Sequence, residues 1–203
     1  MRITYRLIVL FLFIGFSTLT ASDKIALGQK APGFELISSD NEKHSLEQYK
    51  GKIVVLEWIN FGCPFVKKHY KSSNMQNLQK KYVEQEVVWL AICSSATGKQ
   101  GHMEQLKIPA KLKDKGFNAT AYLIDESGDV GKLYEAKTTP HMFVINKEGT
   151  LIYDGAIDDK KSTKIADIKT ADNYVVNILD SLLDGKKPEP LKTSPYGCSV
   201  KYK

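Results

Sequence analysis

Residues 52–66 read Lys52-Ile-Val-Val-Leu-Glu-Trp-Ile-Asn-Phe-Gly-Cys-Pro-Phe-Val66, a buried-strand pattern that leads directly into a cysteine and a helix start. The continuous apolar and β-branched run up to Ile59 predicts a central strand that is covered on both faces. Apolar spacing from Phe65 to about Glu84 predicts a helix, and Pro64 suits its first turn. Cys63 is therefore expected at the helix N-cap, at the carboxyl end of the strand.

This position has a chemical consequence for the Cys63 thiol. Unpaired N–H groups and the positive end of the helix dipole favour a thiolate, so they should lower the thiol pKa. Lys67, one turn into the helix, is expected to act in the same direction. The alternative is that Cys63 is a buried and unreactive small side chain, as free cysteines often are.

The beginning of the chain has the pattern of a secretory signal peptide. Residues 1–22 comprise a short basic start, an apolar stretch and a small-residue cleavage region. An uncleaved anchor is the alternative, although the apolar run is short for a membrane span. We expect an exported protein, periplasmic if its source is a Gram-negative bacterium, with no stable membrane insertion after cleavage. Residues 23–185 are expected to form one domain, followed by a tail at 186–203.

Charge and cysteine content exclude several classes of function. The chain has 203 residues and a formal charge of +6, which falls to +4 without Arg2 and Arg6, its only arginines. The remaining excess is spread along the chain, so nucleic-acid binding is not expected.

The three cysteines, Cys63, Cys93 and Cys198, leave at least one free thiol or an intermolecular bridge. The sequence contains no CxxC or HExxH motif, and its four histidines do not cluster, so we predict no metal site and no cofactor.

Hydrophobic periodicity predicts the remaining elements in chain order. The strand at 86–92 should follow the first helix and pair in parallel with the strand at 53–59. The other expected elements are a hairpin (34–37 with 43–46), a helix at 102–115 interrupted at Ile108-Pro109, a strand at 121–125, a short helix at 130–135, a hairpin (142–145 with 151–153) and a final helix at 165–183.

Five segments carry a resemblance to a known family: Phe61–Tyr70, Ala119–Asp125, Lys137–Ile145, Tyr153–Asp159 and Tyr196–Lys201. Over nearly the whole length from residue 25 to 203, the chain resembles the thioredoxin-like redoxins related to peroxiredoxins, the AhpC/TSA-type family. The resemblance implies an α/β thioredoxin-like fold, in which helices flank a central mixed β-sheet and the chain begins with a β-hairpin.

The resemblance also implies roles for residues around Cys63. Thr139-Pro140 would be the cis-proline loop that faces the active-site thiol and presents backbone to a substrate. Asn60 would occupy the place of the first cysteine of a CxxC motif and line the substrate site. His141 would lie near Cys63, and the alternative for it is a solvent-facing strand residue.

The sequence departs from the peroxiredoxin pattern in two respects. Peroxiredoxins have Thr or Ser three residues before their reactive cysteine, where this chain has Asn60, and they use an arginine that the mature chain does not contain. We therefore expect at most a weak or atypical peroxidase. A second thiol must resolve oxidised Cys63, and Cys198, in a tail expected to be mobile, is the best candidate. The alternatives for Cys198 are a permanent structural disulfide and an unreactive thiol.

The resulting hypothesis is an exported thiol-disulfide oxidoreductase or antioxidant-type redoxin with Cys63 as nucleophile. Its partner would be a protein thiol or disulfide, or a hydroperoxide, and no cofactor is needed. One alternative is a copper-binding module in which Cys63, His141 and Cys198 converge, because soft thiolates select Cu(I). Another is a binding module that has kept the fold and lost the chemistry. Cys93 is most simply a strand-end residue, and a direct redox role is its alternative.

Overall fold

A central eight-stranded sheet organises the part of the chain that the computed structural model describes, residues 25–203. The predicted signal peptide at 1–22 lies outside the described residues. The strand order is β2-β1-β5-β4-β3-β7-β8-β9. The strands are β1 (Glu35–Ser38), β2 (Lys43–Ser45), β3 (Val54–Trp58), β4 (Val88–Cys93), β5 (Ala121–Ile124), β7 (His141–Ile145), β8 (Leu151–Gly155) and β9 (Leu191–Lys192).

The sheet is mixed, as expected. Strand β3 pairs in parallel with β4 and antiparallel with β7, and β4 pairs in parallel with β5. The predicted N-terminal hairpin is β1–β2, which adds antiparallel to β5. A separate two-stranded sheet joins β6 (Thr138–Thr139) to β10 (Cys198–Ser199). The predicted fold class and the predicted β3–helix–β4 unit are therefore confirmed.

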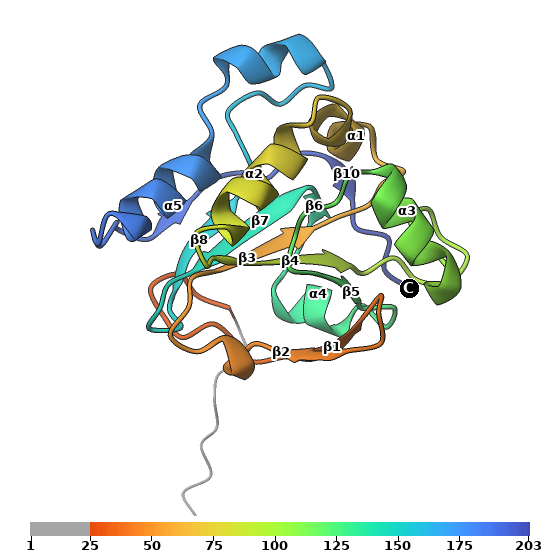
Figure 1. The fold of residues 1–203 in the computed structure, drawn as a ribbon, viewed down its shortest axis with the longest axis horizontal. Helices are drawn as coiled ribbons and strands as arrows, with labels where there is room; N and C mark the ends of the chain where they lie inside the picture. The colour runs from red at the N-terminus through yellow and green to blue at the C-terminus, as the bar shows by residue number, and fades with distance from the viewer. Residues whose placement is uncertain (1–24) are drawn as a thin grey trace, which may run out of the picture.

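Helices cover both faces of the central sheet (Figure 1). They are α1 (Pro64–Lys71), α2 (Asn74–Val83), α3 (Ile108–Asp114), α4 (Asp129–Leu133) and α5 (Tyr174–Leu183), with 3-10 turns η1 (Glu47–Tyr49), η2 (Gln105–Lys107) and η3 (Ile165–Thr170). Alternate β3 residues enter two cores: Val55 packs with α1, α2 and α5, and Leu56 packs with α4. Both faces are buried, which explains the uninterrupted apolar sequence of this strand.

The prediction of a single helix from Phe65 to Glu84 is wrong. The helix stops at Lys71 and restarts at Asn74, because Ser73 adopts a left-handed conformation with φ 59°. The Ser72 hydroxyl donates to the carbonyl of Lys68 at 2.8 Å, which satisfies a helix-end acceptor. Because of the break, the axes of α1 and α2 run in different directions over the sheet (Figure 1).

Two further helix boundaries differ from prediction. Pro109 lies in the first turn of α3 and starts that helix, where we had expected an interruption. The final helix begins at Tyr174, nine residues later than predicted, because the Asn173 side chain accepts the Val176 N–H at 3.0 Å as an N-cap. The residues before it form η3, which packs against α1.

The expectation of a mobile C-terminal tail is also wrong. Strand β9 pairs with β8 and strand β10 pairs with β6, so the tail contributes to both sheets. Beyond β10, the Ala96 N–H donates to the carbonyl of Lys201 at 2.9 Å, and the Tyr202 hydroxyl donates to the carbonyl of Ala136 at 2.7 Å. Within residues 25–203, no helix is long and apolar enough to cross a membrane.

Candidate active site

Cys63 occupies the N-cap of α1, as predicted, with Pro64 at the first helical position. Its backbone is extended (φ −72°, ψ 128°), and its N–H donates to the carbonyl of Asn60 at 2.9 Å, which closes the turn between β3 and α1. The side chain is fully buried. Its thiol donates to the carbonyl of Thr139 at 3.0 Å.

Cys198 lies beside this thiol, because β10 pairs with β6 with Cys198 directly opposite Thr139. Neither cysteine is in a disulfide, and each thiol alters the pKa of the other, as expected for close neighbours. Cys198 is only half-buried, so it lies on the solvent side of the pair. Thr139 thus contacts both cysteines, one through its carbonyl and the other through strand pairing.

The protein shifts the pKa values of the two thiols in opposite directions. Burial is the largest effect on Cys63 and by itself raises the thiol pKa. Hydrogen bonds from the Cys198 thiol and from the N–H groups of Val66 and Cys198 outweigh it, so the pKa of Cys63 is lowered overall. Burial, followed by the neighbouring Cys63 sulfur, raises the pKa of Cys198. Cys63 is therefore the more acidic thiol of the pair, and the neighbouring Cys198 thiol favours its ionised form.

The other predicted site residues are arranged around this pair in different ways. The Thr139–Pro140 peptide bond is cis, and β6 ends there against Cys198. The Asn60 side chain accepts the Gly62 N–H at 2.7 Å and donates to the carbonyl of Gln100 at 3.0 Å, so both ends are engaged within the protein. The Lys67 ammonium acts on Cys198, where its charge partly offsets the rise in the thiol pKa.

His141 is not a solvent-facing strand residue, because its side chain is 2% exposed. Its Nδ1 accepts the Lys137 N–H at 3.2 Å, so Nε2 carries the proton and donates to Asp154 at 2.8 Å. Burial is the main reason that the pKa of His141 is lowered, against the opposing effect of Asp154. Both ring nitrogens are engaged, and a metal ion could bind only by displacing one of these partners.

Among residues 25–203, no group of three histidine, cysteine or acidic side chains is arranged to hold a metal ion. Cys93, at the end of β4, is buried, and its thiol approaches the carbonyl of Gly101 at 3.6 Å. It forms no disulfide.

Sequence reasoning did not single out Glu57, a fully buried carboxylate in the middle of β3. It accepts hydrogen bonds from Trp89 at 2.9 Å, Gln79 at 3.0 Å and Tyr70 at 3.2 Å. Burial raises its pKa to about 7, although these bonds oppose the rise. The available signal was a single acidic residue inside an otherwise apolar strand, a pattern that costs free energy unless the group is hydrogen-bonded.

Comparison with known proteins identifies the family. The AhpC/TSA family pattern matches residues 27–154, more than half of the chain. This protein belongs to the AhpC/TSA family. The chain is 28% identical over 158 residues to the thiol-disulfide oxidoreductase ResA of Bacillus thuringiensis subsp. konkukian, and the match covers 74% of this chain and 86% of that protein. It is also 29% identical over 126 residues to the thioredoxin-like protein YneN of Bacillus subtilis, covering 55% and 73%.

A solved structure extends the likeness to most of the chain. A hypothetical protein of Sinorhizobium meliloti, SMc02350, superposes with a TM-score of 0.72 at 25% identity, covering 89% of this chain and 96% of its own. Together these relatives confirm the predicted family, the thioredoxin-like fold and the general class of thiol-dependent oxidoreductase.

Proposed function

We propose that this AhpC/TSA-family member is an exported thiol-disulfide oxidoreductase whose redox pair is Cys63 and Cys198. The observation that carries the proposal is that Cys198 lies directly opposite Thr139 in the β10–β6 pairing, while the buried Cys63 thiol donates to the Thr139 carbonyl at 3.0 Å. A thiolate with a neighbouring thiol in contact has the parts needed for a two-cysteine exchange cycle.

The cycle conserves atoms and electrons. The Cys63 thiolate attacks one sulfur of a partner's disulfide, the Cys63–partner bond forms, and the other partner sulfur leaves as a thiolate. Cys198 then loses its proton to solvent and attacks the Cys63 sulfur, which forms the Cys63–Cys198 disulfide and releases the second partner thiolate. The partner gains two electrons and this protein loses two. The reverse sequence oxidises a partner dithiol.

A hydroperoxide is a second candidate substrate for the same pair. Attack of the Cys63 thiolate on the peroxide would give a sulfenic acid and an alcohol, and condensation with Cys198 would release water. Two observations favour the disulfide as substrate: the sequence from residue 7 onward contains no arginine to bind a peroxide, and Asn60 is engaged by Gly62 and Gln100. We propose weak peroxidase activity at most.

Export is part of the proposal because residues 1–22 have the signal-peptide pattern. An oxidising compartment would also maintain the disulfide form of the pair. The copper alternative receives less support, since the hydrogen bonds of His141 to Lys137 and Asp154 occupy both ring nitrogens.

Turnover with cysteine variants tests this function. The mature protein, a small dithiol reductant and a disulfide-bonded protein substrate are mixed, and substrate thiols are followed with time. We expect Cys63→Ser to abolish turnover. Cys198→Ser should accumulate a mixed disulfide on Cys63, because the resolving thiol is absent. Cys93→Ser is the matched control and should keep the wild-type rate. Full activity of Cys63→Ser would overturn the assignment of Cys63 as the nucleophile. Absence of turnover in the wild-type protein would overturn the proposed function and favour the redox-silent binding module.

A further inference from the structure

A buried polar cluster joins the C-terminal segment, defined as residues 193–203, to helix α1. The cluster, named here the Asp158 cluster, consists of Lys68, His69, Asp158 and Tyr196. Asp158 is 1% exposed, and its Oδ1 accepts hydrogen bonds from the Tyr196 hydroxyl and from the Lys160 N–H at 2.9 Å. Its Oδ2 faces the Lys68 ammonium at 3.8 Å and His69 Nε2 at 4.0 Å.

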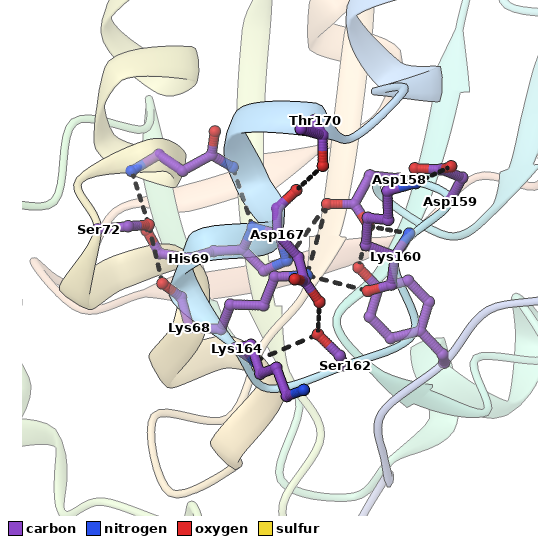
Figure 2. Close-up of polar contacts among 12 residues, drawn as sticks. Lys68, His69, Ser72, Asp158, Asp159, Lys160, Ser162, Lys164, Asp167 and Thr170 are labelled. Carbon is purple, nitrogen blue, oxygen red and sulfur yellow. Dashed lines mark hydrogen bonds and ion pairs between the residues drawn. The ribbon is translucent and has the colours of Figure 1, made fainter.

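Figure 2 shows Lys68 and His69 of α1 pointing toward Asp158 in the loop that follows β8. The Lys68 side chain is fully buried, and its ammonium donates to the carbonyl of Lys160 at 2.9 Å. A buried lysine is rare unless it is paired, so this loop and α1 are fixed to each other. The loop is closed at its base, where Asp159 and Asp172 exchange hydrogen bonds at 3.1 and 2.9 Å.

Tyr196 connects this rigid platform to the redox pair. It precedes Cys198 by two residues, and its ring packs on Phe65, in the first turn of α1, with centroids 5.7 Å apart. The Lys68 ammonium lies 5.6 Å from the same ring. The Tyr196 ring therefore contacts α1, whose N-cap is Cys63. Its hydroxyl bonds Asp158, the carboxylate that pairs with Lys68 of the same helix.

We propose that Tyr196, through its hydroxyl bond to Asp158, is the positioning residue that holds Cys198 against Cys63. This inference rests on the proposed function and concerns its second step, the attack of Cys198 on the Cys63 sulfur. On the other side of Cys198 from Tyr196, the backbone is held by the two-residue strand β10 and by the bond from the Val200 N–H to the carbonyl of Lys137 at 3.1 Å. Without the Asp158 bond, Cys198 would contact Cys63 for a smaller fraction of the time, and intramolecular attack would slow in proportion.

Tyr196→Phe is the test variant, because it removes the hydroxyl and keeps the ring on Phe65. Asp158 retains the Lys160 N–H and the Lys68 ammonium, so its carboxylate is not left unpaired. The matched control is Tyr134→Phe, which loses one hydroxyl bond, to the carbonyl of Pro32 at 2.6 Å, in the core on the other face of the sheet.

The first measurement is the rate at which the Cys63–Cys198 disulfide forms after a pulse of a small disulfide oxidant, with thiols trapped by alkylation at timed intervals. We expect Tyr196→Phe to slow bridging about tenfold, the loss expected for one hydrogen bond to a charged group, and Tyr134→Phe to leave the rate unchanged. An unchanged rate in Tyr196→Phe would overturn the positioning role. If the wild-type protein itself formed no bridge, the proposed function would fail instead.

The second measurement is the pKa of Cys63, from the pH dependence of its alkylation. Because the neighbouring Cys198 thiol lowers the pKa of Cys63, Tyr196→Phe should raise this pKa by on the order of half a unit. The rise should vanish when Tyr196→Phe is added to Cys198→Ser, since Tyr196 then has no thiol to position. A rise of equal size in the Cys198→Ser background would show that Tyr196 acts on Cys63 by another route and would overturn the proposal.

Discussion

Glu57 and Cys63 lie on either side of the same turn, and the fold alters the acidity of both in opposite directions. Burial raises the pKa of Glu57 from 4.5 to about 7, whereas hydrogen bonds lower that of Cys63 despite its burial. The difference follows from the partners. The Cys198 thiol and the N–H groups of Val66 and Cys198 favour the Cys63 thiolate enough to outweigh its burial. The cost of burying the Glu57 carboxylate, in contrast, exceeds the effect of its three bonds.

The raised pKa of Glu57 predicts a pH-dependent stability. Folded Glu57 holds a proton that the unfolded chain releases above pH 4.5, so the free energy of unfolding falls as the pH rises toward 7, by about 3 kcal/mol in total. Glu57→Gln stays neutral: its amide oxygen can accept from Trp89 and Gln79, and its amide N–H can donate to the Tyr70 hydroxyl. Urea unfolding between pH 5 and 8 should therefore show a flatter profile and a more stable variant at pH 8.

Glu84→Gln is the control for this measurement, because Glu84 is an exposed glutamate after α2 and should retain the wild-type profile. If Glu57→Gln and the wild-type protein lost stability equally between pH 5 and 8, the Glu57 carboxyl would not be the titrating group.

Among the elements, the approach of β10 to β6 depends on one glycine. Gly197 has φ +140°, and a Cβ atom there would lie 2.1 Å from the carbonyl oxygen of Thr139. Gly197→Ala should therefore displace Cys198 from Thr139, slow formation of the Cys63–Cys198 bridge about tenfold and lower the free energy of unfolding by about 1–3 kcal/mol. Timed alkylation and urea unfolding measure the two effects.

Gly185→Ala supplies the comparison. Gly185 also has positive φ, +74°, but a Cβ atom there would meet nothing within 4 Å. Gly185→Ala should introduce backbone strain, as Gly197→Ala does, but leave the rate of Cys63–Cys198 bridge formation unchanged. Equal bridging rates in all three proteins would contradict the close approach of β10 to β6.

The sequence predicted elements best where a pattern extends over many residues. The apolar run of β3 and the Cys63-Pro64 junction located the N-cap correctly. The break at Ser73 was missed because one left-handed residue does not interrupt the apolar spacing of α1 and α2. The N-cap at Asn173 was likewise hidden, because apolar residues continue on both sides of it.

The candidate site likewise contains some residues that the sequence could predict and others that it could not. Cys63 and the Thr139-Pro140 turn have local sequence signals. Asp158 and Tyr196 have none, because an aspartate and a tyrosine 38 residues apart in sequence meet only through the packing of the tail. Short strands such as β10 carry too few residues for any periodicity, and their pairing is a property of the folded molecule.

For the molecule as a whole, the C-terminal segment is part of the fold. Tyr196 is 7% exposed and belongs to the core on the α1 side of the sheet. Removing residues 193–203 should therefore lower the free energy of unfolding by at least about 2 kcal/mol, the value for burying one large apolar side chain. Removing Lys203 alone should change nothing. Equal stability of the two truncated proteins in urea would mean that the segment is not docked in solution.

The pairing of Cys63 with Cys198 is tested most directly by peptide mapping with mass spectrometry of a protein that comprises residues 23–203, with free thiols alkylated before and after mild oxidation. We predict that oxidation links the peptides containing Cys63 and Cys198 and leaves Cys93 as a free thiol, and that a dithiol reductant reverses the link. A stable oxidised form in which Cys63 remains alkylatable, or in which Cys198 bridges to Cys93 or to a second molecule, would contradict the assignment of the redox pair.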